Sequence, residues 1–187
     1  MSSEFETKGG PVQRPSTIKV WDPLVRIFHW ALVAGITYEM LAEAGTDTHE
    51  LVGYSLLGLV AFRVIWGFIG SKYARFSDFI ASPANTLAYL KDILIGHPKR
   101  YIGHNPAGAA MVLLLIFAVA GTAGTGWAMT TDTLWGEEWI EELHEVAAYG
   151  TIVLVAGHVI GVIVASIQHR ENLVQAMITG RKQGQAQ

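Results

Sequence analysis

The chain lacks cysteine altogether and has few charged residues. None of its 187 residues is a cysteine, and only 16% are Asp, Glu, Lys or Arg. The absence of cysteine excludes disulfides, thiolate metal sites, iron–sulfur ligation and covalent haem attachment through a C-x-x-C-H motif. Soluble domains of this size carry about a quarter charged residues, whereas 51% of the residues here are hydrophobic. This composition indicates a membrane protein.

Four long stretches are nearly free of charge, at residues 24–41, 51–70, 108–129 and 146–167. Each is close to the length of about 20 residues that an α-helix needs to cross about 30 Å of hydrocarbon. The alternative is a soluble four-helix bundle, whose helices would each carry a polar stripe. The segments "AMVLLLIFAVAG" and "GTIVLVAGHVIGVIVA" have no such stripe. We therefore predict an all-α fold, a transmembrane bundle of four helices.

The basic residues all fall on one side of this arrangement. They precede or open the first predicted helix, end or follow the second, or follow the fourth: Lys8, Arg14, Lys19, Arg26, Arg63, Lys72, Arg75, Lys91, Lys99, Arg100, Arg170, Arg181 and Lys182. Cytoplasmic loops of membrane proteins are enriched in Lys and Arg, so we expect both termini and the loop between helices two and three to be cytoplasmic. The polar first 17 residues show no signal for cleavage, and we expect the first helix to be an uncleaved anchor.

The opposite side of the predicted bundle is acidic and contains no basic residue. Ten acids lie around its two short loops: Glu39, Glu43, Asp47, Glu50, Asp132, Glu137, Glu138, Glu141, Glu142 and Glu145. One interpretation is that the loops simply require polar residues. The other is that the acids create a negative field that attracts a cationic partner. Both interpretations stay open at this point.

The connection between the second and third predicted helices is long and contains the sequence "SPANTLAYLKDILIG". Its Ser–Pro start and its apolar spacing predict a further helix that lies on the membrane interface.

At the start of the first membrane helix, we expect Asp22 to be the N-cap and Pro23 the first helical residue. We divide the chain into a polar tail (1–17), a transmembrane domain (18–170) and a cytoplasmic C-terminal tail (171–187).

Four of the seven histidines fall within the predicted membrane helices or at their mouths: His29, His49, His144 and His158. Ionisable residues are costly in a bilayer and are functional candidates there. A single histidine is more often hydrogen-bonded to a neighbouring helix, but four at regular depths favour a functional role. His144 and His158 are fourteen residues apart, about 21 Å along a helix. We expect His49 and His144 at an outer level, and His29 and His158 at an inner level.

Two histidines between membrane helices suit haem iron, which accepts one imidazole on each face. Zinc normally takes three or four protein ligands. Room for a macrocycle requires small residues, and glycines are frequent in these helices. They also serve ordinary helix packing. The glycines concerned are Gly35, Gly53, Gly58, Gly121, Gly124, Gly126, Gly150, Gly157 and Gly161.

Arg63 lies fourteen residues after His49, at about the depth predicted for His158. A buried arginine requires an anion, and a haem propionate would fit. The alternative is that its side chain extends to the cytoplasmic interface. We assign no catalytic residue.

Several segments together resemble the bacterial cytochrome b561 family, which includes the b-type cytochrome subunits of nickel–iron hydrogenases. They are "VWDPLVRIFHW", "HELVGYSLLGLVAFRVIWGFIGSKYARFSDF", "RYIGHNPAGAAM", "HEVAAYGTIVLVAGHVIGV" and "ENLVQAMITGRK", within residues 18–182. The resemblance implies a four-helix membrane protein with two b haems. It also implies that the iron ligands are His29, His49, His144 and His158. The pairing of His29 with His158, and of His49 with His144, is our inference from depth.

We expect a protein of the bacterial inner membrane that transfers electrons between a periplasmic redox protein and the quinone pool. The partner would be a hydrogenase, another dehydrogenase or a c-type cytochrome, with a basic docking surface. Besides membrane lipid and quinone, we expect no nucleic-acid partner. A quinone would bind near the inner haem, around Arg63, Trp66, His97 and His104. These residues also suit helix capping and interface anchoring.

Three alternatives remain. Some members of the family oxidise superoxide and reduce quinone by themselves, although ten acids on the outer face would repel superoxide. The haems could instead only stabilise a membrane anchor subunit of a respiratory complex. A transporter or metal carrier without haem is the third. An electron-transfer subunit of an oxidoreductase is our expectation over a stand-alone enzyme.

Overall fold

A computed structural model describes residues 17–184, which form seven helices and two short strands. The long helices are α1 (Pro23–Leu41), α2 (Asp47–Ile69), α5 (Pro106–Met129) and α6 (Glu138–His169). The shorter ones are α3 (Phe76–Phe79), α4 (Pro83–Leu94) and α7 (Leu173–Thr179), and the strands are β1 (Thr17–Lys19) and β2 (Arg181–Gln183). The predicted all-α fold is confirmed, with one small antiparallel strand pair added.

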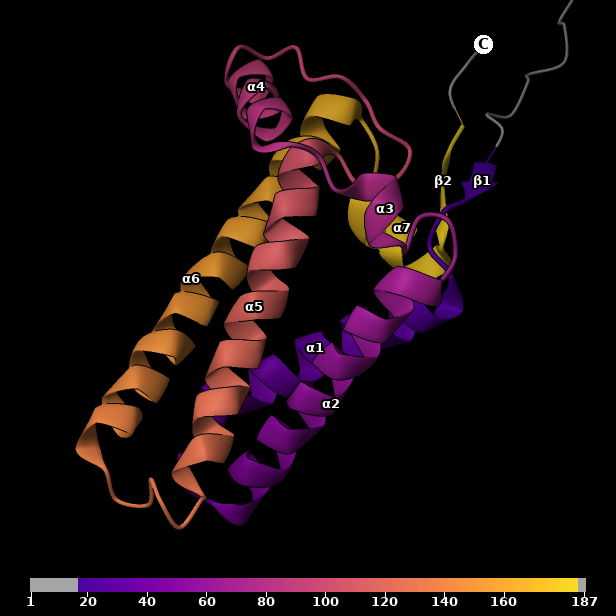
Figure 1. Cartoon of the computed structure of the whole chain (residues 1–187). Coiled ribbons are helices and arrows are strands. Elements are labelled where there is room, and N and C mark those ends of the chain that lie inside the picture. The colour runs from indigo at the N-terminus through magenta and orange to yellow at the C-terminus, as the bar shows by residue number, and fades with distance from the viewer. Residues whose placement is uncertain (1–16, 185–187) are drawn as a thin grey trace, which may run out of the picture.

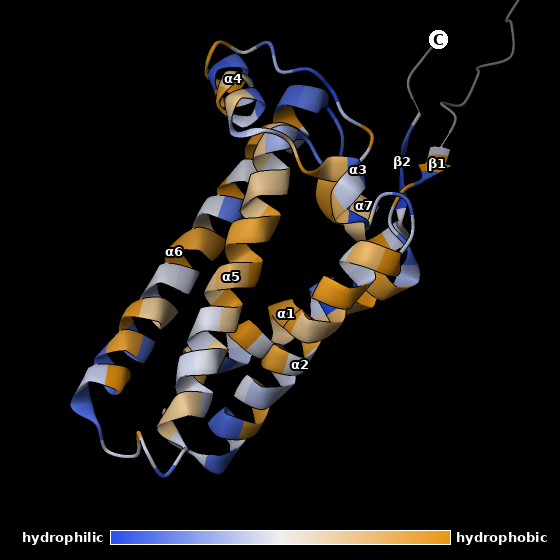
Figure 2. Ribbon diagram, viewed as in Figure 1, coloured by the Kyte–Doolittle hydropathy of each residue, from blue (hydrophilic) through white to orange (hydrophobic). Residues whose placement is uncertain are grey.

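The four long helices are each long and apolar enough to cross a membrane. They match the four predicted stretches, and α6 begins eight residues before the last of them. Large apolar side chains point outward from the bundle, such as Phe117, which is 72% exposed, and Val153, which is 70% exposed. Figure 2 shows apolar residues along these helices and hydrophilic ones gathered towards their ends. This pattern suits helices surrounded by lipid.

The long helices pack in a chain of neighbours. In Figure 1, α1 lies beside α2 and α5 lies beside α6, and α5 also packs against α2. Leu56 and Val60 of α2 and Val119 of α5 are buried where these two helices meet. A Cβ at Gly35 of α1 would lie 2.7 Å from Cδ2 of Leu56. Gly35 therefore serves the close packing of α1 on α2.

Side-chain caps fix where the helices begin. Asp22 accepts a hydrogen bond of 2.9 Å from the backbone nitrogen of Val25, and Pro23 is the first residue of α1, as predicted. Ser82 caps α4, which confirms that the Ser–Pro sequence starts a helix in this connection. Asn105 caps α5 through a 2.7 Å hydrogen bond from the backbone nitrogen of Gly108. Each cap satisfies a backbone donor that the helix itself cannot.

The two ends of the bundle differ in structure. The end that carries β1, β2, α3, α4 and α7 is called the terminal end here, and the end with the α1–α2 and α5–α6 connections is the loop end (Figure 1). At the terminal end, α4 exposes apolar side chains such as Leu94, which is 86% exposed. The basic residues Lys8 and Arg14 lie outside the described residues.

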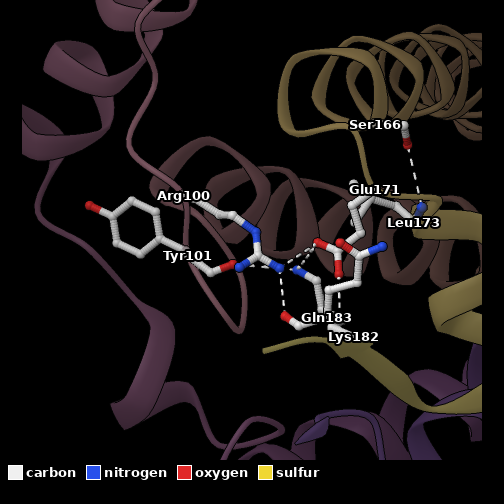
Figure 3. A network of polar contacts seen from close by, with 7 residues as sticks. All are labelled: Arg100, Tyr101, Ser166, Glu171, Leu173, Lys182 and Gln183. Atoms are coloured by element: carbon white, nitrogen blue, oxygen red, sulfur yellow. Dashed lines mark hydrogen bonds and ion pairs between the residues drawn. The ribbon is translucent and has the colours of Figure 1, made fainter. Parts of the chain in front are cut away.

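A buried ion-pair network closes the terminal end (Figure 3). The carboxylate of Glu171 is 5% exposed and accepts hydrogen bonds from Arg100 at 3.2 Å and from the backbone nitrogen of Gln183 at 2.8 Å. Lys182 lies 3.8 Å from the same carboxylate. Burial lowers the pKa of Lys182, and the neighbouring Glu171 opposes this shift. The network thereby ties β2 and the end of α6 to the loop before α5.

We predict that Glu171→Ala loosens the terminal end, because it leaves buried Lys182 without an anion. Breaking a buried pair from one side costs roughly 3 kcal/mol. Hydrogen exchange in detergent should show faster exchange over residues 171–183, with a lower melting temperature. Asp78→Ala is the matched control, because the Asp78–Arg75 pair is more exposed and exposed pairs contribute at most about 1 kcal/mol. Equal effects of the two variants would contradict the assignment.

Candidate functional site

The four membrane histidines form two pairs in the structure. The imidazole rings of His29 on α1 and His158 on α6 have centres 6.4 Å apart. Those of His49 on α2 and His144 on α6 have centres 6.3 Å apart. We name these the inner pair and the outer pair; the outer pair lies nearer the loop end. The structure thus brings together the partners inferred from depth, while their role as iron ligands stays a prediction.

The separation within each pair fits a bis-histidine haem. Two imidazoles on opposite faces of one iron, each at about 2 Å, have ring centres about 6 Å apart. Across the described residues, no group of three or more His, Asp or Glu side chains is arranged to hold a metal ion. A tetrahedral zinc site would need three or four protein ligands. The donor set therefore suits haem iron better than zinc.

Helix α6 supplies one histidine to each pair and makes its extensive packing with α5. In the described part of the chain, α6 has no extensive packing with α1 or α2, the helices that supply the other two histidines. At six of these glycines, no atom beyond the chain neighbours and the backbone of the same helix lies within 4 Å of the place where a Cβ would stand: Gly53, Gly58, Gly121, Gly124, Gly150 and Gly161. The helix separation and these glycines are compatible with a macrocycle between the helices that carry the histidines.

The orientation of His144 is fixed by α5. Its Nδ1 lies 2.9 Å from the carbonyl oxygen of Thr122 and 3.1 Å from the hydroxyl of Thr125. Because a carbonyl only accepts, Nδ1 carries the proton and Nε2 keeps a lone pair that is available to a metal ion. A Cβ at Gly126 would lie 3.1 Å from Cε1 of His144. Gly126 therefore lets the ring approach α5 closely.

The residue in contact with Nδ1 of His49 is the acid Glu39. Glu39 was expected among the acids around the outer loop, but its carboxylate contacts Nδ1 of His49 instead. The Glu39 side chain is only 16% exposed, and its second oxygen, Oε1, is buried without a hydrogen-bond partner. The other nine acids of that group are exposed. No spacing in the sequence distinguishes Glu39 from its neighbours.

The inner pair has a different environment. Nδ1 of His29 is buried and has no hydrogen-bond partner among the described residues. Its ring is edge-on to that of Trp30, with centres 5.1 Å apart. In the outer pair, Nδ1 of His144 forms a hydrogen bond and Nδ1 of His49 contacts a carboxylate, whereas Nδ1 of His29 has neither.

Arg63 is buried, with only 3% of its surface exposed, and its Nη1 has no hydrogen-bond partner. The guanidinium lies over the rings of Phe76 and Phe79, 5.1 and 5.9 Å from their centres. Its side chain does not extend into solvent, so an internal anion is the better of the two interpretations. A buried cation is costly without an anionic partner.

Asp22 is the anion near Arg63, but its oxygens are already engaged. Although burial raises the pKa of Asp22, hydrogen bonds from Ser71, Val25 and Trp66 outweigh this and hold it below its usual value. The indole nitrogen of Trp66 donates to Asp22 at 3.3 Å. Asp22 therefore joins the start of α1 to the end of α2 in addition to capping α1.

Of the other residues predicted near a quinone, His104 is half-buried and His97 is exposed. The ring centre of His104 is 4.7 Å from that of Trp21 and 4.5 Å from that of Phe79. Burial, with the positive charges of Arg63 and Lys182, lowers the pKa of His104 to about 3, so it is neutral. Its Nδ1 is buried without a partner. Arg63, Trp66 and His104 thus share one region, and His97 does not belong to it.

A family model described as prokaryotic cytochrome b561 matches residues 20–180. Among similar proteins, one named probable Ni/Fe-hydrogenase B-type cytochrome subunit from Rhodobacter capsulatus is 24% identical, over 91% of this chain and 83% of that protein. The protein of the same name from Azotobacter vinelandii is 24% identical, over 96% and 95%. That of Rhizobium leguminosarum bv. viciae is 23% identical, over 91% and 90%. No solved structure matches.

The family match and the four apolar helices lead to one assignment. The matched region contains all four long helices and both histidine pairs. A b-type cytochrome carries haem b and transfers electrons. The chain belongs to the prokaryotic cytochrome b561 family and is a multi-pass membrane cytochrome.

Proposed function

We propose that this cytochrome holds two b haems and transfers electrons across the bacterial inner membrane, between a periplasmic redox protein and the quinone pool. The observation that carries the proposal is the presence of two imidazole pairs, with ring centres 6.4 and 6.3 Å apart, each of which has one member on α6. His29 and His158 would bind one iron and His49 and His144 the other. Each haem, when bound, supplies an iron that accepts and releases one electron.

The protein residues separate the two sites along the bundle. His144 and His158 are fourteen residues apart on α6, which places the two levels about 21 Å apart along the helix. The edges of the macrocycles are closer than this because the rings are wide. The apolar helices exclude water around both sites. The chain therefore provides an electron route through the hydrocarbon region.

Arg63 supports the inner site in this proposal. Its guanidinium is buried, Nη1 has no partner, and the nearby Asp22 already accepts several hydrogen bonds. A propionate of the inner haem is an anion that would complete this arrangement. The region of Arg63, Trp66 and His104 is also where we place a quinone.

The charge distribution supports the direction in which the bundle is inserted. Basic residues gather at the terminal end, which we place in the cytoplasm. The nine exposed acids at the loop end would then face the periplasm and attract a basic surface of a redox protein. The similar proteins named as hydrogenase subunits make a hydrogenase one class of partner. A c-type cytochrome or another dehydrogenase is a further class.

We predict that His49→Ala abolishes electron transfer while the inner haem and the assembled complex remain. The two pairs are separate sites, so loss of an outer ligand interrupts the route without removing the inner ligands. Haem content and quinone reduction by the partner protein would be measured in membranes. His97→Ala is the control, since His97 is exposed. Retained quinone reduction in His49→Ala would instead support a haem-stabilised anchor.

We predict that haem reduction by a basic redox protein is faster at low ionic strength, because salt screens the attraction of the exposed acids. Stopped-flow rates over a range of salt concentrations test this. Glu141→Gln with Glu142→Gln should weaken the salt dependence, and Asp78→Asn at the terminal end should not. Fast reduction by superoxide that does not depend on salt would favour a superoxide:quinone oxidoreductase over this proposal.

A further inference from the structure

The contact between Glu39 and His49 is unusual for a membrane helix. Glu39 lies within α1, near its end, and its carboxylate is turned towards α2 rather than into solvent. One oxygen contacts Nδ1 of His49, and the other is buried without a hydrogen-bond partner. A carboxylate inside a membrane protein is costly and is a candidate for a functional role.

The histidines differ in what their Nδ1 atoms meet. His49 meets the carboxylate of Glu39, and His144 meets the backbone carbonyl of Thr122 at 2.9 Å. Nδ1 of His29 is buried without a partner. Within residues 17–184, neither His29 nor His158 forms an ion pair with a carboxylate. Within the described residues, only the outer pair therefore combines a carboxylate contact with a carbonyl acceptor.

A carboxylate at Nδ1 changes the ligand strength of an imidazole. The acceptor keeps the proton on Nδ1, leaves Nε2 free for the metal and raises the basicity of the ring. A more basic ligand and a nearby negative charge both stabilise the more positive, ferric iron over the ferrous one. The midpoint potential of a haem held by such a ligand is therefore lowered.

We propose that Glu39 is a positioning residue that orients His49 and sets the midpoint potential of the outer haem below that of the inner haem. This inference rests on the two-haem function proposed above. One electron then passes favourably from the loop end to the terminal end, which oxidises the outer site and reduces the inner one. No proton leaves Glu39, His49 or His144, and no bond to them breaks. The redox protein at the loop end supplies the electron.

The variant Glu39→Gln tests the role of the charge, because it keeps the size of the side chain. Potentiometric titration should show the outer haem shifted to higher potential and the inner haem unchanged. We expect at least a tenfold change in the equilibrium constant for reduction, which is about 59 mV for one electron. The electron paramagnetic resonance of the outer ferric haem should change as well, since it reports on the imidazole ligand.

Glu43→Gln is the matched control, because Glu43 is an exposed acid at the same end of the bundle. It should leave both potentials unchanged. Unchanged potentials in Glu39→Gln with both haems retained would overturn the inference. If the unaltered protein binds fewer than two haems, this result would overturn the proposed function instead.

A second measurement does not depend on whether Glu39→Gln retains its outer haem. The midpoint potentials of the two haems are measured in the unaltered protein. The potential of the outer haem is identified with the variant His29→Ala, which lacks a ligand of the inner haem. A lower outer potential supports the inference. An outer potential equal to or above the inner one contradicts it.

Discussion

The pairing of imidazoles across gaps between helices is the constraint on which this structure depends. Polar rings inside a membrane bundle are costly, and in the outer pair both Nδ1 atoms meet polar groups of neighbouring residues. At the outer pair, Thr122 and Glu39 meet the Nδ1 atoms of His144 and His49. Helix α5 carries none of the four histidines, yet it packs against α6 and orients His144. The candidate site therefore depends on this helix as well as on those that carry the histidines.

The terminal end keeps the helices in register around the inner pair. Asp22 joins the start of α1 to Trp66 near the end of α2, and Glu171 joins the end of α6 to Arg100 and β2. At the same end, the buried cation of Arg63 lies over the aromatic rings of Phe76 and Phe79. The two ends thus differ: the loop end exposes acidic side chains, and the terminal end buries charged side chains.

The features that could be predicted from the sequence depend on local pattern or on helix geometry. The lengths of the apolar stretches predicted the four spans, and Asp22 and Pro23 predicted the start of α1. The number of residues between each histidine and the membrane boundary predicted the two histidine pairs. Glu39 could not be separated from the other acids, because its direction depends on the rotation of α1 against α2. The burial of Arg63 likewise depends on Phe76 and Phe79, which follow α2 and fold back over it. The elements α7 and β2 are too short to have a periodic signal. Glu171 accepts a hydrogen bond from the backbone of Gln183 in β2, and the backbone nitrogen of Gly180 donates to the carbonyl of Ala176 in α7.

The central claim is that one chain holds two b haems, and the ratio of haem to purified protein tests it most directly. A reduced-minus-oxidised spectrum of the unaltered protein, combined with pyridine haemochrome and protein assays, gives both haem type and ratio. The account predicts b-type bands and about two haems per chain, one for each histidine pair. A ratio of one, or a purified folded protein without haem, would contradict it.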